Sequence, residues 1–183
     1  MKKILITLLI LVSSCSFLLA QRPSVISPEV HPDNSVTFRF SARNAKSVSL
    51  ETELLPAPVE MTKDASGVWS ITIPPATPDI YPYCFIVDGI KVNDPNNTYL
   101  FANEGFKYSL VDIKGDKPLV HSLQNVPHGK VSYRSYKTAQ NSNGRLLIYT
   151  PPGFDVNVST KYPVLYLIHG GSDTEETWTK VGK

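Results

Sequence analysis

Serine, histidine and glycine residues near the end of the chain are of the types used in ester hydrolysis, but their spacing does not make a complete site. A serine hydrolase needs a serine on a sharp strand-to-helix turn, a histidine base, an acid that orients the histidine, and amide donors for the oxyanion. The sequence contains no Gly-x-Ser-x-Gly motif. Ser172 follows Gly171 but precedes Asp173, so we interpret it as a polar loop residue before a helix.

The backbone at Gly170 and Gly171 is the best candidate for a catalytic feature. These glycines follow the apolar run 164–168 and His169. Glycines in such a place let the backbone approach a substrate closely and turn an N–H toward developing negative charge. The residues alone also allow a simpler interpretation, in which the two glycines only make a tight strand-to-helix turn.

The remaining histidines and acids do not indicate a metal or a cofactor. The chain has four histidines: His31, His121, His128 and His169. His31 is close to Asp33, but a proline separates them and no further ligands are nearby, which favours a loop. Asp94 and Asp112 are interpreted as a turn residue and a strand-end residue. We therefore expect no cofactor and no metal site.

The first twenty residues have the pattern of a signal peptide. Lys2 and Lys3 precede an apolar run from 4 to 12, and a second short run ends at Ala20. We expect cleavage after Ala20 and export to the periplasm or the medium. In the alternative, Cys15 is lipidated and anchors the chain to the outer membrane, which would be its only membrane contact.

Composition favours a folded, exported and neutral protein. The chain has 183 residues, of which 42% are hydrophobic and 19% charged, enough to bury a core. Lys2 and Lys3 account for the formal net charge of +2, so no basic surface for nucleic acid is expected. After removal of the expected signal peptide, Cys84 is the one cysteine left, so an internal disulfide is excluded. We interpret Cys84 as a small buried side chain.

Alternating apolar residues predict an all-β immunoglobulin-like sandwich over residues 21–113. The alternation is clearest over 36–41, 47–50, 69–73 and 81–87, with turns at 64–67 and 88–89. Trp69 shares one strand face with Ile71 and Ile73, so we expect it in the core.

A polar segment, residues 114–118, is the predicted linker to a second unit over 119–183. That unit begins with a predicted hairpin, residues 131–136 and 145–149, which turns at 141–144. The run 164–168 has no alternation and predicts a strand buried on both faces, as in an α/β sheet. Residues 173–176 fit the cap of a helix that carries Trp178. Residues 119–183 are too few to complete an α/β domain, so we expect this unit to be incomplete.

Two known families resemble these units. The sandwich resembles the early-set domain of family 48 carbohydrate-binding modules, on Gly67–Ile73, Tyr81–Gly89 and Asn93–Pro95. The second unit resembles the start of the family 1 carbohydrate esterases, which include feruloyl, acetylxylan and enterochelin esterases. The matching pieces are Val126–Gly129, Tyr149–Phe154 and Tyr162–Gly171.

The resemblance implies the truncated start of an α/β-hydrolase domain and an exported serine carboxylic-ester hydrolase acting on feruloyl or acetyl esters of polysaccharides. It places an oxyanion donor at Gly171, supported by Gly170, and gives His169 a structural role. The nucleophile, acid and base would lie beyond this chain, which is therefore expected to be inactive alone. A non-catalytic glycan-binding or spacer protein, and a siderophore esterase, remain alternatives.

The glucan site of the binding-module family is altered in this sequence. The resemblance places a stacking tryptophan just after the Asp88-Gly89 turn, where this chain has Lys91, and a lysine where it has Cys84. Lys91 offers charge but no aromatic face for a sugar ring. We therefore expect the sandwich to bind starch and β-cyclodextrin weakly or not at all.

Overall fold

The computed structural model describes residues 25–101, 105–155, 159–171 and 173–180. The expected signal peptide, Cys15 and Ser172 lie outside the described residues. Within the described ranges, no helix has the length and apolar character needed to cross a membrane.

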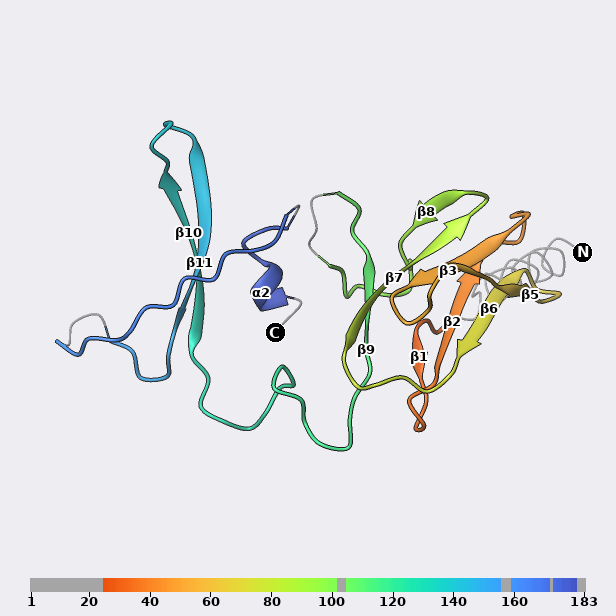
Figure 1. The fold of residues 1–183 in the computed structure, drawn as a ribbon, viewed down its shortest axis with the longest axis horizontal. Helices are drawn as coiled ribbons and strands as arrows, with labels where there is room; N and C mark the ends of the chain where they lie inside the picture. The colour runs from red at the N-terminus through yellow and green to blue at the C-terminus, as the bar shows by residue number, and fades with distance from the viewer. Residues whose placement is uncertain (1–24, 102–104, 156–158, 172, 181–183) are drawn as a thin grey trace, which may run out of the picture.

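Two antiparallel sheets make up the N-terminal unit, as the alternation predicts (Figure 1). The first sheet has the order β1-β2-β6-β5, formed by β1 (Glu29–Val30), β2 (Val36–Ser41), β6 (Val68–Ile73) and β5 (Thr62–Lys63). The second has the order β4-β3-β7-β8, formed by β4 (Val59–Glu60), β3 (Val48–Thr52), β7 (Ile80–Val87) and β8 (Ile90–Val92). A further strand of the second sheet, β9 (Ser109–Asp112), also pairs with β7.

Aromatic residues from both sheets fill the core between them. Phe38 of β2 meets Tyr83 of β7 edge to face, with ring centroids 4.7 Å apart, and Phe40 lies 4.9 Å from Phe85. Trp69 is buried, and its indole N–H donates a 2.9 Å hydrogen bond to the carbonyl oxygen of Ala42. The core position predicted for Trp69 is confirmed, and the indole is not available for stacking on a ligand.

Turns with positive φ connect the strands. Asp88 (φ 48°) and Gly89 (φ 86°) form the two-residue turn between β7 and β8. The Asp88 carboxylate accepts hydrogen bonds from the backbone N–H groups of Lys46 and Ser47, at 2.8 and 2.9 Å. These bonds, chiefly the one from Ser47, lower the pKa of Asp88. The side chain thereby ties the β7–β8 turn to the start of β3.

The second unit contains the predicted hairpin and a short helix. Strand β10 (Lys130–Lys137) pairs antiparallel with β11 (Asn143–Thr150), with Lys130 opposite Thr150 and Lys137 opposite Asn143. Asn141, at φ 58°, lies in the connecting turn. Helix α2 (Thr177–Lys180) carries Trp178 as expected. Figure 1 shows the hairpin apart from the sandwich, joined to it by a long connecting segment.

The strand expected at residues 164–168 does not form. Over the described residues of this segment no strand is assigned, and its side chains are exposed, Leu167 at 58% and Ile168 at 84%. A strand buried on both faces exists only between paired neighbours that are covered by helices. In the part of the chain that the structure describes, no such neighbour pairs with it. The prediction of a buried strand here is therefore wrong, and the described residues show no α/β-hydrolase part.

Candidate functional site

The Gly170–Gly171 loop follows the segment 164–168, in which no strand is assigned, and precedes the turn before α2. The carbonyl oxygen of Gly170 accepts a 3.3 Å hydrogen bond from the backbone N–H of Asp173 and lies 2.8 Å from Nδ1 of His169. Gly171 is exposed, and an added Cβ there would meet open space. His169 thus contacts the loop backbone directly. The oxyanion role of Gly171 stays a prediction.

The sandwich histidine His31 and the connector histidine His128 have local partners. His31 Nε2 lies 2.7 Å from the Thr37 hydroxyl, which lies 2.8 Å from the Thr72 hydroxyl. His128 Nε2 lies 3.0 Å from the carbonyl oxygen of Gln124. No group of three or more His, Cys, Asp or Glu side chains with metal-binding geometry occurs among the residues that the structure describes.

Asp94 occupies a turn, as predicted, but it is also almost completely buried, with 2% of its surface exposed. Its carboxylate accepts hydrogen bonds from the Tyr83 hydroxyl at 2.9 Å and from the backbone N–H of Asn96 at 2.8 Å. The Asn97 amide donates to the same tyrosine oxygen at 2.9 Å. Burial, and then the Asp94 charge, raise the pKa of Tyr83 far above its usual value. This network fixes the turn that leads into the segment containing Phe101 and Tyr108.

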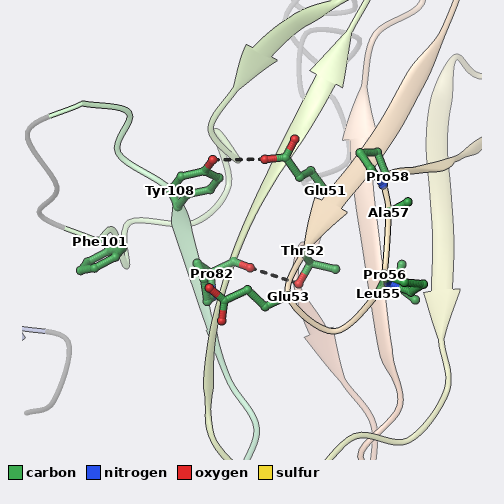
Figure 2. Close-up of a pocket in the computed structure, with 10 residues that line it drawn as sticks. All are labelled: Glu51, Thr52, Glu53, Leu55, Pro56, Ala57, Pro58, Pro82, Phe101 and Tyr108. Carbon is green, nitrogen blue, oxygen red and sulfur yellow. Dashed lines mark hydrogen bonds between the residues drawn. The ribbon is translucent and has the colours of Figure 1, made fainter. Parts of the chain in front are cut away.

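A groove of about 410 Å³ opens beside that segment (Figure 2). We call it the Glu51 groove. Phe101 and Tyr108 lie on one side of it in Figure 2, and the loop after β3 lies on the other. Its lining residues are Glu51, Thr52, Glu53, Leu55, Pro56, Ala57, Pro58, Pro82, Phe101 and Tyr108. Sequence reasoning missed this groove, because its walls come from segments about fifty residues apart.

An ion-pair cluster lies at the Tyr108 side of the groove. Lys91 Nζ donates to the Glu51 carboxylate at 2.5 Å and to the Tyr108 hydroxyl at 3.0 Å, and the Tyr108 hydroxyl donates to Glu51 at 3.1 Å. The ammonium also lies 5.4 Å from the centre of the Tyr108 ring. The hydrogen bond to Glu51, followed by the one to Tyr108, raises the pKa of Lys91.

Cys84 is buried next to this cluster. Its side chain is fully inaccessible, as predicted, and it lies opposite Glu51 in the β3–β7 pairing. Burial raises the pKa of the thiol to about 11; the Glu51 charge adds to this effect and the Lys91 charge opposes it. At neutral pH the thiol is therefore protonated, which makes it a packing group and a poor nucleophile.

The groove has the chemistry of a binding surface. Phe101 and Tyr108 offer aromatic faces, and the carboxylates of Glu51 and Glu53 can accept hydrogen bonds from hydroxyl groups. Its ten lining residues include no serine, histidine or cysteine. Lys91, at the position where the family resemblance would place a stacking tryptophan, is held by Glu51 and Tyr108.

The chain is similar to part of a curated enzyme. No family model matches the chain. The chain is 28% identical over 170 residues to an endo-1,4-beta-xylanase/feruloyl esterase from Xylanibacter ruminicola, and this match covers 88% of the chain. It spans 23% of the length of that protein.

Several solved structures are similar to part of the chain. The group B Streptococcus pullulanase SAP in complex with maltotetraose is 18% identical, with a TM-score of 0.42, over 50% of this chain and 15% of that one. A putative alpha amylase from Salmonella typhimurium is 21% identical, also with a TM-score of 0.42, over 60% of this chain and 18% of that one. The sandwich assignment therefore rests on the strand pairing of this structure. By sequence, most of the chain is thus similar to part of a carbohydrate-active hydrolase.

Proposed function

We propose that the chain is the N-terminal part of an exported serine carboxylic-ester hydrolase that removes feruloyl or acetyl groups from polysaccharides. The observation that carries this proposal is the 28% identity with a xylanase/feruloyl esterase. The match extends over 170 residues, so it must include residues from both the sandwich and the second unit. A match confined to the sandwich would favour a binding module alone.

In this proposal the two units have different tasks. The sandwich packs beside the catalytic domain and shapes its substrate cleft, while the Gly171 backbone N–H is one of the oxyanion donors. The nucleophile, the acid and the base lie beyond residue 183. Residues 1–20 direct export, or Cys15 carries a lipid anchor.

Reading the gene beyond codon 183 tests the proposal. Continuation into a Gly-x-Ser-x-Gly elbow, followed by an acid and a histidine, would support it. Expression of the continued reading frame should then release ferulate from methyl ferulate or acetate from acetylated xylan. The 183-residue chain should not hydrolyse p-nitrophenyl acetate above a buffer control, and Ser172→Ala should change nothing. A stop codon directly after Lys183 would contradict the proposal.

The Glu51 groove favours a second candidate, a non-catalytic glycan-binding protein. Its aromatic side chains can stack on a sugar ring, and its carboxylates can accept hydrogen bonds from sugar hydroxyl groups. Affinity electrophoresis of the full chain in gels that contain arabinoxylan tests this function. Retardation that Phe101→Ala abolishes and Trp69→Phe preserves would support binding in the groove. Equal mobility with and without polysaccharide would contradict glycan binding and would favour a spacer role for the sandwich.

A further inference from the structure

Two acidic side chains hold the segment after the Gly170–Gly171 loop against the β10–β11 hairpin. Arg145 Nε of β11 lies 2.9 Å from a carboxylate oxygen of Glu175. The Tyr133 hydroxyl of β10 donates to the Glu176 carboxylate at 3.1 Å. Helix α2 begins directly after these two acids, and Figure 1 shows it close to the hairpin. Each strand of the hairpin therefore supplies one contact to the segment.

Arg145 and Tyr133 lie on the same face of the hairpin. In the register of the two strands, Arg145 is opposite Ser135, which is two residues from Tyr133. Side chains two residues apart along a strand share a face. Arg134, the other arginine of the hairpin, is opposite Leu146 and lies on the other face. The two contacts thus define one side of the hairpin as the side to which the segment docks.

The two carboxylates are partly shielded from water. The side chain of Glu175 is 17% exposed and that of Glu176 is 24% exposed. Lys180 Nζ of α2 lies 2.5 Å from Glu176, and the hydrogen bond from Lys180 lowers the pKa of Glu176; the hydrogen bond from Tyr133 adds to this effect. Salt and water screen charge pairs less when one partner is partly buried. These contacts are therefore better placed to hold the segment than pairs in open solvent.

Backbone hydrogen bonds connect the acidic residues to the glycine loop. The Thr174 hydroxyl accepts a 3.3 Å hydrogen bond from the backbone N–H of Glu176. The Thr174 carbonyl oxygen accepts another from the backbone N–H of Thr177, at 3.1 Å. One residue earlier, the backbone N–H of Asp173 donates to the carbonyl oxygen of Gly170 at 3.3 Å. A movement of Glu176 away from the hairpin would consequently shift the glycine backbone as well.

We propose that Arg145 and Tyr133 are positioning residues for the Gly170–Gly171 loop, because their contacts with Glu175 and Glu176 set where the loop backbone lies relative to the hairpin. A backbone N–H stabilises an oxyanion effectively only when it is held in place before the reaction. The value of this positioning for catalysis rests on the proposed hydrolase function. The positioning itself does not depend on that function.

Backbone order parameters of the Gly170 and Gly171 amides in the 183-residue chain test the positioning. In the unmodified chain we expect values typical of ordered backbone, about 0.85. Arg145→Gln and Tyr133→Phe should each lower these values, and the double variant should bring them below about 0.6. Arg145→Lys keeps the charge and should retain most of the order. Arg134→Gln is the matched control, because it removes an arginine from the opposite face of the hairpin.

Amide chemical shifts of β10 and β11 report in each variant whether the hairpin is intact. Tyr133→Phe keeps both the ring and the net charge, so it still tests the proposal if Arg145→Gln disturbs the hairpin. The proposal would be overturned if Arg145→Gln and Tyr133→Phe changed the order parameters of the loop no more than Arg134→Gln does.

The catalytic consequence is measured separately, on the protein made from the continued reading frame. Removal of one oxyanion donor lowers kcat by about 10²–10³-fold, and a donor that is only loosened should cost less. We expect Arg145→Gln to lower kcat about tenfold with little change in KM for methyl ferulate, and Arg134→Gln to change neither. An unchanged kcat in an active enzyme would contradict the catalytic value of the positioning. If the unmodified protein were inactive, the hydrolase function would fail, while the order parameters would still decide whether Arg145 and Tyr133 position the loop.

Discussion

Removing one buried hydroxyl group, by Tyr83→Phe, should destabilise the sandwich strongly. The Tyr83 ring packs on Phe38 and would keep that contact. The hydroxyl, however, donates to the buried Asp94 carboxylate at 2.9 Å and accepts from the Asn97 amide at 2.9 Å. The substitution leaves a buried acceptor and a buried donor each short of one partner.

The expected cost follows from these contacts. A hydrogen bond to a charged group contributes roughly 1.5–3 kcal/mol, and the loss falls in this range because Asp94 is 2% exposed. We therefore expect the free energy of unfolding to fall by about 2 kcal/mol or more. For a unit of this size, 2 kcal/mol corresponds to a decrease in Tm of roughly 8–16 °C.

Urea unfolding followed by tryptophan fluorescence measures this loss, with the m-value expected to stay constant. Tyr81→Phe is the matched control. The Tyr81 hydroxyl donates to the carbonyl oxygen of Thr77 at 3.0 Å in a more exposed setting, so its removal should cost about 1 kcal/mol or less. The reasoning would be refuted if Tyr83→Phe were no more destabilising than Tyr81→Phe.

Three other outcomes are expected. In a Cys15→Ser chain at about pH 8, Cys84 should react with Ellman's reagent only after urea is added, because the thiol is fully buried and its pKa is raised to about 11; rapid labelling of the folded chain would contradict this. The full chain should run unretarded in starch gels, because Lys91 is held by Glu51 and Trp69 is in the core; retardation that disappears in Trp69→Ala would show the core assignment to be wrong. The backbone hydrogen bonds from Ser47 and Lys46 hold the folded pKa of Asp88 below the usual 3.8 of an aspartate. Its contribution to stability is therefore complete above that value and is lost as the pH falls through the lower folded pKa. The urea concentration at the midpoint of unfolding should therefore decrease when the pH is lowered below about 4. In Asp88→Ala this decrease should be smaller.

The longer strands of the sandwich could be predicted where buried and more exposed residues alternate, as they do along β3. Apolar residues also alternate along β2 and β6, which placed Trp69 in the core correctly. The Asp88-Gly89 turn was also predictable, because its backbone conformation restricts the residue types that can occupy it.

The groove and the buried acid could not be predicted in the same way. Glu51 and Tyr108 meet across 57 residues of sequence, and no local pattern marks such a pair. Asp94 is hydrogen-bonded to Tyr83 of β7 and Ser109 of β9, so its surroundings depend on how these two strands pair. The prediction of a strand at residues 164–168 was wrong for a related reason. The apolar composition of this segment suits a buried strand, but a strand forms only when a neighbour pairs with it. No neighbour pairs with it among the described residues.

The unequal lengths of the edge strands have a consequence for self-association. In the sandwich, β1, β4 and β5 are each two residues long, so these edges offer another chain little backbone for pairing. The β10–β11 hairpin is different, because each eight-residue strand pairs only with the other within the described structure and has one open edge. Exposed Tyr133, Ile148 and Tyr149 lie along these strands. Concentrated solutions of the chain should therefore associate through the hairpin rather than through these two-residue edges.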